Sequence, residues 1–270
     1  MKSVFSKERF VTVLAAFAVL AGAVIRCILL SGAVPAAESN DLSLCFYICF
    51  AAGILLFAAS SFMLFSGKTD TVGPSLESGM FLPCILGAAG VFCDFIYQCL
   101  SCYDYVSRTA YPAANRIVPM IACAVFALLS CAYFIVLSIC SRSRSFDLGR
   151  LRLLCFTPLL WAFCHVLLGL TEYESAYNDT ESALKYITLI FGLLFFFLLA
   201  AQKEGAKANG SLAFFGFAYS SMCFVCAAPR IIAYALGAQL PQAGYFSVSF
   251  LLVGVFAFAA AAEISFKKKV

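Results

Sequence analysis

Eight long apolar runs constrain this chain more than any other feature of its sequence. Each run is close to the roughly 20 residues that a helix needs to cross about 30 Å of hydrocarbon. Membrane β-strands are shorter and alternate polar with apolar residues, so continuous runs are typical of helices. The sequence therefore predicts an all-α, polytopic membrane helix bundle of about eight transmembrane helices, near residues 10–31, 43–65, 79–100, 117–140, 152–171, 184–202, 211–236 and 244–264.

The composition agrees with a single integral membrane domain that covers residues 1–270. Hydrophobic residues make up 63% of the chain and charged residues 12%, which excludes an ordinary soluble protein. The connections between the runs are too short for a soluble domain, and none contains a glycine-rich nucleotide loop. We expect membrane lipids as partners and no cofactor. The net charge of +4 calls for no nucleic-acid partner, because anionic lipid headgroups attract basic loops.

The distribution of lysine and arginine predicts the orientation in the membrane. With the N-terminus inside, thirteen of the 18 basic residues fall on the cytoplasmic side. The outer side then holds only Arg108, Arg116 and Lys185. Cytoplasmic loops of membrane proteins are enriched in lysine and arginine. We therefore predict a multi-pass plasma-membrane protein with both termini in the cytoplasm.

Four ionisable residues interrupt the predicted helices: Arg26, Asp94, His165 and Arg230. They lie on the first, third, fifth and seventh helices, all of which run outward. Each is about four to seven positions before the outer end of its helix, so we expect them at a similar depth. Their regular spacing is compatible with four tandem helical hairpins, although eight similar helices with short loops would produce it without duplication.

Helical geometry predicts that these residues face other helices. At about 100° per residue, Asp94 shares a face with Gly87, Gly90 and Gln98, and small residues allow helices to pack closely in membranes. A charge in hydrocarbon usually has a partner or lines a wet cavity. We therefore predict that Asp94 pairs with Arg26 or Arg230, which leaves the other arginine to bind an anion.

The main functional hypothesis is an outward-facing polar pocket within the membrane. Its ligand would be an anionic small molecule or a lipid headgroup, and the protein would be a transporter or a small-molecule or lipid-binding sensor subunit. The candidate ligand-binding residues are Arg26, Asp94, Gln98, His165, Arg230 and Tyr234. One alternative is a structural or assembly subunit, with a membrane-protein partner, in which an ion pair only fixes helix register. Another is an intramembrane enzyme that uses Asp94 and His165; we favour a role that is not enzymatic.

The cysteines and prolines add two further hypotheses. Most of the fourteen cysteines suit small apolar positions in helices, but Cys99 and Cys102 form a C-x-x-C pair that a thiol oxidoreductase would use. No metal site is predicted. Pro229 directly precedes Arg230, and a proline inside a helix leaves a backbone carbonyl without its donor. A kink there would either free carbonyls next to the Arg230 guanidinium, as where helices open around a ligand, or serve helix packing alone.

Overall fold

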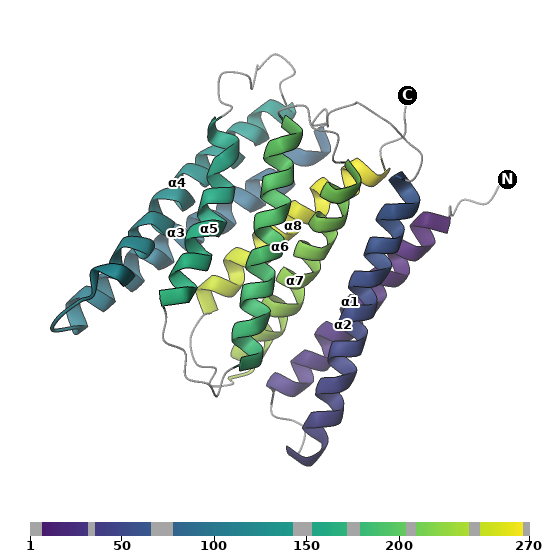
Figure 1. The fold of residues 1–270 in the computed structure, drawn as a ribbon, viewed down its shortest axis with the longest axis horizontal. Helices are drawn as coiled ribbons and strands as arrows, with labels where there is room; N and C mark the ends of the chain where they lie inside the picture. Colours follow the sequence, from purple (N-terminus) through teal and green to yellow (C-terminus); the bar gives the residue numbers. More distant parts are fainter. Residues whose placement is uncertain are drawn as a thin grey trace.

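The computed structural model describes residues 7–31, 36–65, 78–142, 153–171, 179–203, 209–237 and 244–266. These residues form eight long helices that are apolar enough to cross a membrane, which confirms the predicted fold class (Figure 1). The helices are α1 (Lys7–Leu30), α2 (Ala36–Phe65), α3 (Phe81–Arg108), α4 (Ala114–Arg142), α5 (Thr157–Thr171), α6 (Asp179–Lys203), α7 (Asn209–Ala235) and α8 (Gly244–Phe266). A short 3-10 turn, η1 (Ser78–Met80), precedes α3.

Six of the helices form a closed ring. Each helix from α3 to α8 packs against the next one along the chain, and α3 also packs against α8. The remaining two helices, α1 and α2, pack on each other and on α7 (Figure 1). The molecule is therefore a six-helix ring with one helical hairpin attached to it.

Aromatic side chains fill the inside of the ring. The Phe134 and Phe256 rings lie 4.7 Å apart, and Phe196 lies 5.9 Å from Tyr219. All four side chains are buried, and they belong to one continuous cluster with residues of α3 and α5. Aromatic pairs at these separations add specific edge-to-face attraction to the packing. The ring therefore encloses a solid core around its polar residues.

Glycines on α3 let this helix approach its neighbours closely. A Cβ atom at Gly90 would lie 2.9 Å from the backbone oxygen of Ser249 on α8, and one at Gly87 would lie 3.3 Å from the ring of Phe134. Both glycines are buried, together with Asp94 and Gln98. The predicted inward face of small and polar residues is thus confirmed for this helix.

The tip of the α3–α4 hairpin is longer than the sequence pattern predicted. Helix α3 continues to Arg108 instead of ending near residue 100, and α4 begins at Ala114. The tip is closed by Tyr105, whose hydroxyl accepts a 3.2 Å bond from the Ala113 amide and whose ring lies 4.7 Å from Arg116. Apolar length predicts only the part of a helix that lies in hydrocarbon, so the two polar turns were missed. Helix α2 likewise begins at Ala36 rather than near residue 43.

Helix α1 begins and helix α8 ends at the same end of the bundle (Figure 1). The excess of lysine and arginine predicts that this end is cytoplasmic, and labelling can test that prediction. Ser145 and Ser175 lie outside the described residues, in the connections before α5 and after it. In intact cells a membrane-impermeant maleimide is expected to modify Ser175→Cys and to spare Ser145→Cys, with the wild-type protein as the background. If only Ser145→Cys is modified, the protein has the opposite orientation.

Candidate functional site

The candidate site is built around a carboxylate at the midpoint of a helix. Asp94 lies 13 residues after the start of α3 and 14 residues before its end. At 1.5 Å per residue it is about 20 Å from either end of the helix. Because α3 is longer than the sequence predicted, Asp94 lies deeper along its own helix than expected. The α3–α4 tip extends well beyond the neighbouring end of α5 (Figure 1).

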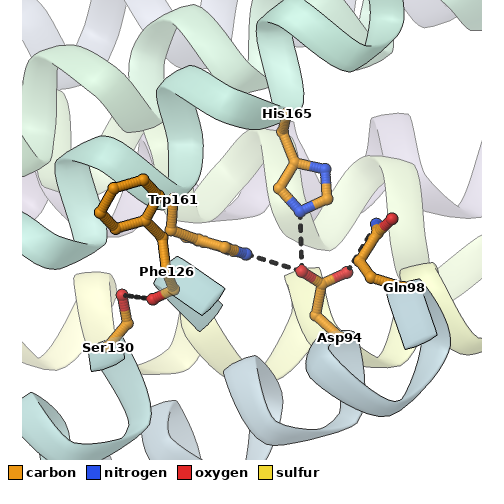
Figure 2. A network of polar contacts seen from close by, with 6 residues as sticks. All are labelled: Asp94, Gln98, Phe126, Ser130, Trp161 and His165. Atoms are coloured by element: carbon orange, nitrogen blue, oxygen red, sulfur yellow. Dashed lines mark hydrogen bonds and ion pairs between the residues drawn. The ribbon is translucent and has the colours of Figure 1, made fainter. Parts of the chain in front are cut away.

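Two side chains of α5 form hydrogen bonds with the same oxygen of Asp94. Trp161 Nε1 and His165 Nε2 each lie 2.7 Å from Asp94 Oδ2 (Figure 2). Trp161 and His165 are four residues apart, so one turn of helix places both on the same face of α5. Their rings meet edge to face at 5.2 Å, and Phe250 of α8 lies 6.4 Å from the imidazole. The contacts therefore join α3 to α5 inside the ring.

The polar side chains of this site are almost completely buried. The exposed fractions are 0% for Asp94, 1% for Trp161, 2% for His165 and 2% for Gln98. An indole N–H can only donate, so Trp161 requires the Asp94 oxygen as an acceptor. Hydrogen bonds of this kind are strong in a low-dielectric interior, and removal of one partner leaves the others without compensation. We refer to Asp94, Gln98, Trp161 and His165 as the Asp94 centre.

The second oxygen of Asp94 has a weaker contact. Gln98 Nε2 lies 3.4 Å from Oδ1, one turn further along α3 (Figure 2). The Gln98 Oε1 atom is buried and has no hydrogen-bond partner within the described part of the chain. Buried acceptors of this kind are uncommon in native proteins and call for an explanation. The Oδ1 side of the carboxylate therefore retains acceptor capacity for a proton or a donor group.

The predicted pairing of Asp94 with an arginine is wrong. Its hydrogen-bond and ion-pair partners in the described residues are Trp161, His165 and Gln98, and no arginine is among them. Helix α1, which carries Arg26, packs on α2 and α7, whereas α3 packs on α4 and α8. A similar depth in the membrane therefore did not make Arg26 and Asp94 neighbours, because the two residues lie in different parts of the bundle.

Arg26 instead contacts α7. Its Nη1 atom donates to the Val225 carbonyl oxygen at 3.3 Å and lies 3.6 Å from the Cys226 thiol. The Thr188 hydroxyl of α6 lies 3.4 Å from the same sulfur, and the Phe46 ring of α2 lies 5.9 Å from the guanidinium carbon. Arg26 is thus a polar link between the attached hairpin and the ring.

The remaining predicted site residues are on α7 and towards the end of α3. Arg230 is half-buried on α7, and Tyr234 is 68% exposed near the end of that helix. Cys99 is exposed and Cys102 is half-buried on α3, and all fourteen cysteines are free thiols. The structure therefore joins Asp94, Gln98 and His165 in one centre and does not add Tyr234 or the C-x-x-C pair to it. Whether any of these residues binds a ligand stays a prediction.

Sequence reasoning missed Trp161 as a member of the site. The signal was available, because Trp161 is the only tryptophan of the chain and lies one turn before the only histidine. A buried indole N–H usually finds an acceptor, and the nearby helices offer few polar side chains. Among the described residues no cluster of three or more His, Cys, Asp or Glu side chains is arranged to hold a metal ion.

No protein family, curated protein or solved structure matches this chain. The chemistry that the geometry of the bundle offers is acid–base chemistry, because a carboxylate and an imidazole share a short hydrogen bond deep inside a membrane protein.

Proposed function

We propose that this protein is a proton-linked membrane transporter, in which the Asp94 centre takes up and releases a proton. The observation that carries this proposal is the 2.7 Å contact between Asp94 and His165, both buried inside the six-helix ring. Ionisable residues within membrane helices commonly mark ion pathways, and chains of Asp and His form proton relays in pumps and transporters. Histidine is the side chain whose ordinary pKa lies closest to physiological pH.

The arrangement offers a place for the proton. Oδ2 is occupied by two donors, whereas Oδ1 has only the 3.4 Å contact with Gln98. Proton uptake at Oδ1 would leave the bonds from Trp161 and His165 in place. Loss or gain of charge at the carboxylate would alter the attraction between α3 and α5, which the same bonds hold together. A change of charge would thus become a change of helix packing.

Two unique residues make the proposal directly testable. Because the chain has one histidine and one tryptophan, ¹⁵N-histidine NMR and tryptophan fluorescence each report only on the Asp94 centre. In lipid nanodiscs, the signals of His165 and Trp161 are expected to change together when the pH is varied. Asp94→Asn should shift or abolish it. The control is Asp104→Asn, because Asp104 is an exposed residue of the same helix that pairs with Arg108 at 3.5 Å.

Transport itself is measured in proteoliposomes that contain a trapped pH dye. Acetate, succinate and inorganic phosphate are the probes, because the predicted ligand is anionic. Proton-linked transport is supported if one of these anions changes the dye signal with the wild type but not with Asp94→Asn. If His165 and Trp161 do not respond to pH in the wild-type protein, the proton-linked function is refuted.

A second candidate function is a sensor subunit that binds an anionic small molecule or lipid headgroup near Arg26. The observation in its favour is that Arg26 is buried where α1 meets α7, and that Cys226, which it contacts, lies four residues before Arg230 on α7. Guanidinium groups are well suited to carboxylates and phosphates. Inorganic phosphate and vesicles of phosphatidylglycerol are the two probes. The sensor is favoured over the transporter if one of these probes raises the unfolding temperature of the wild type but not of Arg230→Gln, and if His165 does not respond to pH.

A further inference from the structure

Helix α7 contains a backbone carbonyl that its own helix cannot satisfy. Pro229 has no N–H, so the carbonyl of Val225, four residues earlier, lacks the donor that a regular helix would provide. Val225 is buried, where an unpaired carbonyl is costly. The Arg26 guanidinium of α1 supplies a replacement at 3.3 Å. The sequence placed the Arg230 guanidinium beside this carbonyl, whereas the guanidinium that contacts it belongs to Arg26.

The proline of helix α5 lies in the first turn, where a proline deprives no carbonyl of the same helix of its donor. The neighbouring Thr157 hydroxyl donates to the Leu154 carbonyl just before the helix at 2.8 Å. That bond is local, so it moves together with the helix. In α7 the replacement comes from a different helix, so the bond exists only while α1 is in position.

We infer that Arg26 is a releasable latch on α7 at its Pro229 break, and that it couples the α1–α2 hairpin to the Asp94 centre. The coupling rests on the function proposed above. The latch bond is long for an N–H···O contact, which usually spans about 2.7–3.2 Å. It is therefore weak enough to be exchanged. Proline positions are also where membrane helices most readily bend.

The aromatic core provides the physical connection from α7 to the Asp94 centre. Tyr219 of α7 contacts Phe196 of α6 at 5.9 Å, and Phe196 lies 6.3 Å from Trp161. Trp161 in turn donates to Asp94. All three rings are fully buried, and a close-packed core transmits small displacements. A bend of α7 at Pro229 would thus move the ring that packs on the tryptophan of the site.

The latch is tested by hydrogen–deuterium exchange of α7 in nanodiscs. Arg26→Met removes the donor but keeps a side chain of similar length. Exchange in residues 219–228 is expected to become about tenfold faster, because the Val225 carbonyl loses its partner. Pro229→Ala restores an N–H for that carbonyl, so Arg26→Met should have no effect on exchange in this background. Pro229→Leu replaces Pro229→Ala if the alanine variant does not fold.

A matched control separates the latch from general damage to α1. Thr12→Val removes the 2.5 Å contact between Thr12 and Ser60, which joins α1 to α2 without involving α7. It should leave exchange in α7 unchanged, and Arg26→Lys should retain part of the protection. If Arg26→Met accelerates exchange equally with Pro229 present or replaced, Arg26 acts by packing alone and the latch is overturned.

The coupling is tested separately by the fluorescence of Trp161. The pH midpoint of its emission is expected to shift in Arg26→Met and to return towards the wild-type value in the double variant Arg26→Met/Pro229→Ala. An unchanged midpoint in Arg26→Met would overturn the coupling. The exchange experiment and the fluorescence experiment separate this inference from the proposed function, because exchange in α7 does not depend on proton uptake at the Asp94 centre. Absence of any wild-type titration would refute the proposed function, and the coupling with it, while the exchange data would still decide the latch.

Discussion

Asp94→Ala is expected to destabilise the protein in detergent by about 3–5 kcal/mol, the range for removal of one member of a buried polar pair. The substitution leaves the indole N–H of Trp161 and the imidazole of His165 without their 2.7 Å acceptor inside the ring. Each unsatisfied buried donor costs about 1–3 kcal/mol. The measurement is equilibrium unfolding, with retention of the monodisperse folded state as the first readout.

A double-mutant cycle identifies the true partner of Asp94. In a Trp161→Phe background, Asp94→Ala should lower the free energy of unfolding by less than in the wild type, because the indole N–H that would lose its acceptor is no longer present. Arg26→Met should give no such relief, since Arg26 contacts α7 rather than Asp94. Asp104→Ala is the surface control, and its exposed pair with Arg108 is expected to contribute only about 0–1 kcal/mol. Relief by Arg26→Met instead of Trp161→Phe would contradict the described geometry.

Gly90→Val is expected to have the second largest effect. Even the Cβ atom of the new side chain would lie 2.9 Å from the Ser249 backbone oxygen and 3.0 Å from the Leu252 Cβ atom. The Ser249 backbone oxygen cannot move aside as the end of a flexible side chain can. Helices α3 and α8 must therefore move apart. Overpacking of this kind costs about 1–3 kcal/mol. Thermal unfolding measures the loss of stability.

The same variant should disturb the Asp94 centre, because Gly90 precedes Asp94 by one helical turn on the buried face of α3. We expect a change in Trp161 emission in Gly90→Val. Gly79→Ala is the control, since a Cβ atom at Gly79 would meet nothing within 4 Å. Normal stability of Gly90→Val would show that α3 and α8 are not in close contact, and the closed ring would then be wrong.

The sequence was sufficient for the fold class because hydrophobic length is a property of each helix alone. The inward face of α3 followed from helical periodicity in the same way, through Gly87, Gly90 and Gln98. The end of α3 at Arg108 could not be predicted from hydropathy, since its last turns are polar and are held by contacts of Tyr105 with the start of α4.

The partners of Asp94 could not be predicted because they depend on which helices are neighbours. A common depth put Arg26, Asp94, His165 and Arg230 in one layer, and charge complementarity then favoured an arginine. The arrangement of helices decided otherwise: α5 presents His165 to α3, while α1 packs on α7. Periodicity fixes the face of each helix, but only tertiary packing decides which faces meet.

The closed ring also has a consequence for how the chain is made. The contact that seals it joins α3 to α8, which leaves the ribosome after the other helices of the ring. Synthesis from the N-terminus proceeds at about 5–20 residues per second. Asp94 is therefore synthesised several seconds before its partners on α5, and its glycine face waits longer still for α8. During that interval the nascent chain must keep a lone carboxyl group among lipid tails or beside an insertion factor. A chain truncated before α8 would remain in this unsealed state, and it should be a preferred substrate for membrane quality-control proteases.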